Sequence, residues 1–142
     1  MKKKKLFFIS AASSIHTVKW VNALSKNYEV HLIYCKNHQP KVDTISSDVI
    51  LHSLTLNAPL GYYLNSFELK KLYKRISPDI VNVHYASGYG TLARISKLDN
   101  IILSVWGSDV YDFPNQSKIK KRILEKNVKH AKCIASTSNV MA

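Results

Sequence analysis

The chain has 142 residues, of which 46% are hydrophobic and 21% are charged. This length fits one domain, and the apolar fraction is high enough to build a core, which excludes a wholly disordered chain. Lys and Arg number 21 against 9 Asp and Glu, so the net charge of +12 implies a polyanionic neighbour such as nucleic acid, anionic lipid or a phosphorylated small molecule.

Several protein classes are excluded by what the sequence lacks. No run of about 18 apolar residues occurs, so no membrane span is predicted, and the apolar run after the basic residues 2–5 is too short for a signal peptide. Cys35 and Cys133 are too few for a disulfide framework or a metal site. We therefore expect a cytoplasmic protein without bound metal, in which both cysteines are free thiols of the core.

Two kinds of apolar pattern alternate along the chain. Short runs of β-branched and aromatic residues indicate buried strands, whereas apolar residues spaced three or four apart indicate amphipathic helices. In chain order, the expected elements are a strand at 5–9, a helix to about 27, strands at 28–34 and 49–51, a helix at 65–77, a strand at 79–84, a helix at 88–98, a strand at 101–105, a helix at 117–131 and a strand at 132–135.

Polar residues indicate where the first two helices begin and end. Ser13 or Ser14 can cap the first helix, and Asn65 with Glu68 resembles a capping box that opens the second. Pro78 ends the second helix, because proline disfavours helical geometry at the residue before it.

The alternation predicts an α/β protein, a Rossmann-like three-layer sandwich on a mostly parallel sheet of about six strands. Nothing in residues 1–142 indicates a second domain or an internal repeat. Ligands of such sheets bind beyond the carboxyl ends of the strands. The candidate site therefore lies in the segments that follow the strands, at residues 10–16, 84–90, 106–112 and 136–139.

The first of these segments is small and polar. It leads into a helix whose unpaired N–H groups suit a phosphate or a sugar, although a Ser-capped loop without a ligand fits the same residues. No G-x-G-x-x-G or G-x-x-x-x-G-K-[ST] motif occurs, so dinucleotide binding has little support and phosphate-loop ATPase chemistry is excluded. His16, in the first helical turn, can meet a sugar hydroxyl or a leaving phosphate, or simply face solvent.

The segments after the fourth and fifth strands carry further polar and aromatic residues. His84 ends the fourth strand, at the edge where ligands bind. Trp106 offers a flat apolar face on which a sugar ring can stack, and Gly107 allows a tight turn. Asp109 can accept hydrogen bonds from hydroxyls or from backbone N–H groups. A turn with a packed Trp and an Asp-capped loop is the alternative reading of this segment.

Basic residues gather on two of the expected helices. Such faces are usually just solvated, but they can also contact anionic lipid, to which each Lys or Arg near the surface contributes about 1 kcal/mol. The two clusters are Lys70, Lys71, Lys74 and Arg75 on one helix, and Lys121, Arg122, Lys126 and Lys129 on the other.

Four segments, in this order, resemble family 4 glycosyltransferases of the GT-B fold. Residues 13–24 (SSIHTVKWVNAL) with 28–33 (YEVHLI) are similar to the opening of that family, and residues 78–84 (PDIVNVH) to its strand ending in His. Residues 104–110 (SVWGSDV) resemble its [HW]-G-[ST]-D segment, and 131–138 (AKCIASTS) its A-D-x-I-x-x-x-S strand. Each motif is weakly specific, but the ordered set spans nearly the whole chain.

The resemblance implies two Rossmann-like halves around a cleft, of which this chain is the N-terminal, acceptor-binding half. We expect the C-terminal nucleotide-sugar-binding domain to be absent from the chain, and the fragment alone to be inactive. The resemblance implies transfer of a sugar, with retention, from a nucleotide-sugar donor to a glycan or lipid-linked acceptor in surface polysaccharide synthesis. It implies no cofactor, and a location in the cytoplasm or at the inner face of the membrane.

The resemblance also assigns site residues. Trp106 stands where other members have His, so stacking or shape is its expected role rather than catalysis. We predict His16, His84 and Asp109 as catalytic residues, and as substrate-binding residues Ser13, Ser14, Trp106, Gly107 and Ser108.

Two alternatives stay open at this point. One is a stand-alone basic Rossmann-like module that binds nucleic acid or anionic membrane surfaces. Nucleic acid is not the expected partner, because the aromatic residues are not interleaved with the basic ones. The other alternative is a structural partner for a separately encoded donor subunit.

Overall fold

Six parallel strands form a single sheet in the computed structural model, which describes residues 2–136. The order across the sheet is β3-β2-β1-β4-β5-β6, and every neighbouring pair is parallel. The predicted α/β, Rossmann-like fold is confirmed, with a sheet that is wholly rather than mostly parallel. The strands are β1 (Lys5–Ile9), β2 (Glu29–Cys35), β3 (Ile50–Leu54), β4 (Ile80–His84), β5 (Ile101–Val105) and β6 (Cys133–Ser136).

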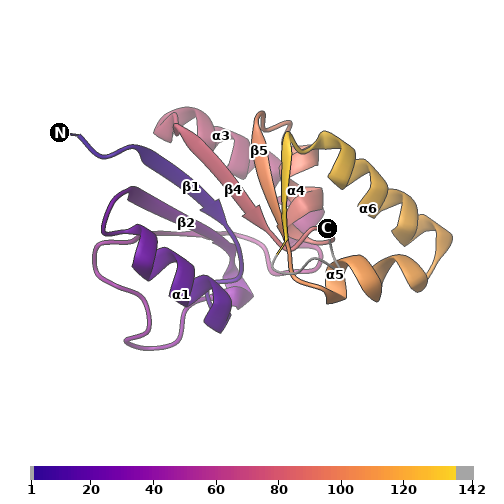
Figure 1. Ribbon diagram of the computed structural model, residues 1–142, viewed down its shortest axis with the longest axis horizontal. Helices are drawn as coiled ribbons and strands as arrows, with labels where there is room; N and C mark the ends of the chain where they lie inside the picture. The colour runs from indigo at the N-terminus through magenta and orange to yellow at the C-terminus, as the bar shows by residue number, and fades with distance from the viewer. Residues whose placement is uncertain (1, 137–142) are drawn as a thin grey trace.

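Helices cover the two faces of the sheet unequally. Figure 1 shows α1 on one face and α3, α4 and α6 on the other. The sequence patterns did not predict α2, α5 or the two short 3-10 turns at Lys36–His38 and Phe113–Asn115. The α-helices are α1 (Ile15–Leu24), α2 (Gly61–Leu64), α3 (Ser66–Ile76), α4 (Tyr89–Ile95), α5 (Ser108–Tyr111) and α6 (Lys118–His130).

Alternate residues of β1 point into two separate cores. Leu6 and Phe8 pack on the α1 side, whereas Phe7 and Ile9 pack on the side of α3, α4 and α6. Burying a side chain of this size stabilises the fold by about 1.5–3 kcal/mol, so β1 is held firmly between two helical layers. The α1 layer contacts mainly β2. The same face of β4 and β5 is therefore left to form one wall of a pocket.

Strand register brings the carboxyl ends of the strands to a common edge. Ile9 is paired with Ile33 on one side and with Val83 on the other, and Val105 is paired with Ser136. The segments 10–16, 84–90 and 106–112 leave the sheet at this edge. The fourth predicted segment, 136–139, lies outside the described residues after Ser136.

The predicted capping box at Asn65 and Glu68 is wrong. Asn65 has φ −82° and ψ 3° because α2 ends there, whereas a capping residue is normally extended. Its side chain instead accepts from the Leu56 N–H at 3.1 Å and donates to the Leu56 carbonyl at 3.0 Å. The Glu68 carboxylate accepts from the Thr55 N–H at 3.0 Å. Both side chains therefore fasten the segment between β3 and α2.

The expectation of two buried cysteines is correct only for one of them. Cys35 is fully buried at the end of β2, but Cys133 is exposed. Cys133 lies on β6, the outer strand of the described sheet, where one strand edge has no partner to cover it among residues 2–136.

Candidate functional site

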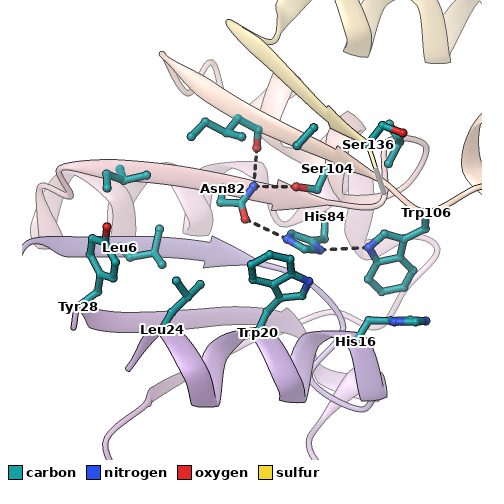
Figure 2. Close-up of a pocket in the computed structure, with 14 residues that line it drawn as sticks. Leu6, His16, Trp20, Leu24, Tyr28, Asn82, His84, Ser104, Trp106 and Ser136 are labelled. Atoms are coloured by element: carbon teal, nitrogen blue, oxygen red, sulfur yellow. Dashed lines mark hydrogen bonds between the residues drawn. The ribbon is translucent and has the colours of Figure 1, made fainter. Parts of the chain in front are cut away.

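A pocket of about 440 Å³ lies between α1 and the β4–β5 part of the sheet. Trp20 and Leu24 of α1 form one wall (Figure 2). Ile80 of β4 and Ile102 of β5 also line the pocket. Histidine, tryptophan and serine side chains lie toward the carboxyl edge, whereas the rest of the lining is mostly apolar. The pocket thus joins an apolar sheet face to a polar rim.

His84 is held by a hydrogen-bonded chain of side chains. The indole N–H of Trp106 donates to His84 Nδ1 at 3.1 Å, and His84 Nε2 lies 2.9 Å from Asn82 Oδ1. Because an indole nitrogen can only donate, Nδ1 must be the unprotonated nitrogen, and we assign the proton to Nε2. The Asn82 amide completes the chain by donating to Ser104 Oγ at 3.1 Å and to the Ile102 carbonyl at 2.9 Å.

The charge state of His84 follows from its surroundings. Burial, the larger cause, and the electrostatic effect of the neighbouring His16 together lower the pKa of His84 from 6.5 to about 4. Phe8 lies against the ring, with a centroid separation of 4.4 Å. At neutral pH His84 is therefore a neutral imidazole with both nitrogens occupied.

Trp106 lies at the centre of an aromatic cluster. Its ring centroid is 5.7 Å from that of His16, 6.1 Å from that of His84 and 5.5 Å from that of Tyr85. His16 comes from the first turn of α1 and is exposed, and no hydrogen bond joins its ring to another group of residues 2–136. Of the two histidines at the rim, His16 is the one whose nitrogens can face a ligand.

Asp109 is a fully buried residue whose carboxylate binds backbone groups. It accepts from the N–H groups of Trp106 and Gly107, each at 2.9 Å, and from that of Ala86 at 2.6 Å. Hydrogen bonds to a charged acceptor are among the stronger ones in proteins. The carboxylate thus ties the segment after β5 to the segment after β4.

Asn127 of α6 holds the same segment from the other side. Its amide donates to the Ala86 carbonyl at 2.9 Å and to Thr91 Oγ1 at 2.8 Å, while its oxygen accepts from Arg94 Nε at 2.7 Å. The peptide groups on both sides of Ala86 are therefore fixed. Their neighbour Tyr85 has a φ of 75°, in the left-handed region that a residue with a side chain rarely adopts.

The remaining predicted residues lie at the same edge. Ser13 and Ser14 are half-buried, and the Ser13 N–H donates to the His38 carbonyl at 3.1 Å. Ser14 stands at the start of α1, but its side chain makes no capping hydrogen bond. Gly107 has φ 116°, which favours glycine, and Ser108 is exposed at the start of α5.

The family is decided by comparison with known proteins. Residues 5–138 match the profile of a family described as glycosyl transferase 4-like. The chain belongs to the glycosyl transferase 4-like family. This confirms the resemblance of its ordered motifs to family 4 glycosyltransferases.

Other comparisons of this glycosyl transferase 4-like chain concern its fold. A search of curated proteins found no match. Among solved structures, the chain is similar to a wide-type short-chain dehydrogenase/reductase from Veillonella parvula DSM 2008 in complex with NADP, with a TM-score of 0.54 and 12% sequence identity. The alignment covers 94% of this chain and 67% of that one. At this identity the similarity concerns the Rossmann-like fold alone.

The candidate site of this glycosyl transferase 4-like domain includes side chains that were not among the predicted site residues. Trp20, Asn82 and Ser104 line the pocket, and Tyr85 joins the aromatic cluster. A signal for Asn82 was present, because it is a polar residue within an otherwise buried strand, where an unpaired amide would be costly. Tyr85 gave no such signal, since its left-handed backbone depends on hydrogen bonds from distant residues.

Proposed function

We propose that the chain is the acceptor-binding half of a glycosyltransferase in surface polysaccharide synthesis. It would take part in moving a sugar from a nucleotide-sugar donor to a glycan or lipid-linked acceptor, with retention at the reacting carbon. A second, nucleotide-sugar-binding domain would complete the cleft, and the 142-residue chain alone would be inactive. No cofactor is proposed, because the donor is itself a substrate.

One observation carries this proposal beyond the family match. Three segments far apart in sequence bring His16, His84 and Trp106 into one cluster at the edge of a pocket. Aromatic faces suit the apolar faces of sugar rings, and the neighbouring imidazole suits a hydroxyl or a phosphate oxygen. The arrangement is the one expected of a site that orients a carbohydrate.

The geometry supports different roles for the three predicted catalytic residues. We propose that His16 touches substrate, through an acceptor hydroxyl or the leaving phosphate. His84 acts through Trp106, because its two ring nitrogens are occupied by Trp106 and Asn82. Asp109 acts by fixing the segments around Trp106 and Ala86. Both are positioning residues in this proposal.

The chemistry then rests on placement and charge rather than on a strong base. A retaining transfer in which the leaving phosphate takes the acceptor proton needs reactants held in close contact. Ser13 and Ser14, at the start of α1, would contact the donor phosphate or the acceptor, and Gly107 and Ser108 would line the acceptor side. The positive net charge suits anionic donors, acceptors and inner-leaflet lipids.

The location that we propose is the cytoplasm, with peripheral binding to the membrane where a lipid-linked acceptor would be found. Among residues 2–136, no helix combines the length and the hydropathy needed to span a bilayer. Exposed basic residues on α3 and α6 support contact with anionic lipid.

The test is a transfer assay with the complete protein, including its donor-binding domain, and a panel of radiolabelled nucleotide sugars in host membranes. His16→Ala should lower kcat by about 100-fold, as expected when one group that stabilises developing charge is removed. Lys19→Ala, at an exposed position of the same helix that does not line the pocket, is the matched control and should keep full activity. Transfer by the 142-residue chain alone, or no transfer with any donor, would contradict the proposal.

A further inference from the structure

An exposed apolar stripe follows α2 and the first turn of α3. Leu60 is 60% exposed, Tyr63 45%, Leu64 58% and Phe67 81%. Tyr63 and Leu64 are adjacent, and each lies three or four residues from Leu60 and from Phe67, so the four side chains share one side of a nearly continuous helical segment. Large apolar side chains that are this exposed and this close together mark a contact surface.

The opposite side of the segment is fixed against the body of the domain. Gly61, Asn65 and Leu69 are buried, and the ring of Tyr62 lies so close to Gly88 that no Cβ would fit there. Asn65 also holds Leu56 through two hydrogen bonds. The stripe therefore cannot turn inward without breaking these contacts.

Basic residues continue the stripe along α3. Lys70, Lys71 and Lys74 follow Phe67 at the same three- and four-residue spacing, and Lys71 and Lys74 are exposed. The one acidic residue of α3 is Glu68, whose carboxylate already binds the Thr55 N–H. Apolar and positively charged side chains thus follow one another on a single exposed side.

We propose that residues 60–74 are an anchor that docks the domain on an anionic lipid surface. Leu60, Tyr63, Leu64 and Phe67 enter the boundary between headgroups and acyl chains. Lys70, Lys71 and Lys74 contact the lipid phosphates. An amphipathic helical segment with apolar and Lys-rich portions is typical of proteins that lie in the membrane interface, and the net charge of +12 favours an anionic surface over a neutral one.

The anchor is joined to the candidate site. The stripe begins after β3, at the carboxyl edge of the parallel sheet, because α3 then runs back to the start of β4. Tyr62 packs on Gly88 and on Tyr89, with a centroid separation of 5.1 Å between the two tyrosine rings. Docking at this end would bring a lipid-linked sugar beside the rim. That orientation rests on the proposed function, whereas lipid binding itself does not.

The other basic helix provides the matched control. On α6, Ile119 is 72% exposed among Lys118, Lys121 and Arg122, yet it has no apolar companion of similar exposure within one turn. Charge is thus present on both helices, but an exposed apolar stripe only on α2 and α3 within the described residues. A variant of Ile119 separates binding by this stripe from general attraction of the positive charge.

The experiment is co-sedimentation of the 142-residue chain with vesicles of phosphatidylcholine alone or with phosphatidylglycerol. The wild type should bind the mixed vesicles and release them at high salt. Leu64→Ser with Phe67→Ser should weaken binding about tenfold or more, since two apolar side chains no longer enter the lipid. Ile119→Ser should change binding by less than about twofold. Phe67→Trp should retain binding, and its tryptophan emission should shift to the blue on addition of vesicles by more than that of the wild type.

Other outcomes overturn the anchor. If Ile119→Ser weakened vesicle binding as much as Leu64→Ser with Phe67→Ser, or if the wild type did not bind the mixed vesicles, the anchor would be contradicted. A dimer in sedimentation velocity that Phe67→Ser dissociates, without vesicle binding, would assign the stripe to a second copy of the chain. Preference for a DNA oligonucleotide over vesicles would assign the charge to nucleic acid. Sugar transfer by the complete protein without any vesicle binding would leave the proposed function intact and remove the anchor.

Discussion

The indole N–H of Trp106 and Nδ1 of His84 are 3.1 Å apart, and this contact fixes the proton of a buried imidazole on its other nitrogen. His84 is the last residue of β4 and Trp106 directly follows the neighbouring strand β5, at the position where the predicted motif allows His or Trp. A donor at this position makes His84 an acceptor. The pair therefore fixes a neutral imidazole beneath the aromatic cluster.

Trp106→Phe should raise the pKa of His84 from about 4 toward 6.5, because Nδ1 loses the donor that competes with protonation. The measurement is an NMR titration of the histidine ring protons. Trp20→Phe is the matched control, since the Trp20 ring lies 6.3 Å from that of His84 and no hydrogen bond between the two is found. An unchanged His84 pKa in Trp106→Phe would show that burial and the neighbouring His16 set its value without help from the Trp106 hydrogen bond.

The fold should lose stability as the pH falls below 6.5. Burial lowers the pKa of both His84 and His52 to about 4, so the unfolded chain binds more protons than the folded one between pH 4 and 6.5. The free energy of unfolding is then at its full value above pH 6.5 and decreases as the pH falls toward 4. For His84, which is buried, the loss is on the order of 3 kcal/mol near pH 4, of which about 2 kcal/mol is already lost at pH 5.

Urea unfolding at about pH 7 and about pH 5 measures this loss. His84→Gln should make the free energy of unfolding less dependent on pH, because one proton-linked group is removed. His52→Gln measures how much of the pH dependence of the free energy of unfolding comes from His52, whose ring stacks on that of His31. An equally steep decrease of stability in both variants would place the proton uptake elsewhere.

Much of the fold was predictable because its signals are local. The apolar runs at 5–9 and 101–105 match β1 and β5, and parallel topology then brings the segments after the strands to one edge. The predicted residues His16, His84 and Trp106 lie together for that reason. Element type and connection are thus enough to predict which segments meet at one edge of a sheet of this kind.

The roles of individual side chains were less predictable because they depend on contacts distant in sequence. The motif allows Asp109 to accept hydrogen bonds either from a ligand hydroxyl or from the backbone. The structure shows the second role, because Asp109 accepts from the N–H of Ala86, 23 residues away. Ala86 is in turn held by Asn127, 41 residues further along the chain. Likewise, Asn65 was expected to cap a helix, but α2 leaves it in a conformation that cannot do so.

Asp109→Asn should destabilise the domain by about 2–4 kcal/mol. The amide keeps one oxygen for three backbone N–H groups and turns a donor toward at least one of them, which leaves buried donors unpaired. Asp112→Asn, an exposed carboxylate nearby, is the control and should stay within about 0.5 kcal/mol of the wild type. Equal stability of the two variants in urea unfolding would show that the Asp109 contacts contribute little.

Tyr85 provides a direct measure of strain at the site. Its φ of 75° is held by hydrogen bonds on both sides, where the Tyr85 N–H donates to the Ser104 carbonyl at 3.0 Å and Asp109 and Asn127 hold Ala86. A left-handed backbone costs a residue with a Cβ about 1–2 kcal/mol more than it costs glycine. Strain of this kind persists where the surroundings fix the backbone, which is common at functional sites.

Comparing Tyr85→Gly with Tyr85→Ala isolates this strain, because both variants lose the ring and only one retains a Cβ. Tyr85→Gly should be the more stable of the two by about 1 kcal/mol in urea unfolding. At Lys126, exposed in the middle of α6, the order should be reversed, with the alanine variant about 1 kcal/mol more stable than the glycine variant. If alanine were also the better residue at position 85, the left-handed backbone would not be strained, and Asp109 and Asn127 would not be needed to hold it.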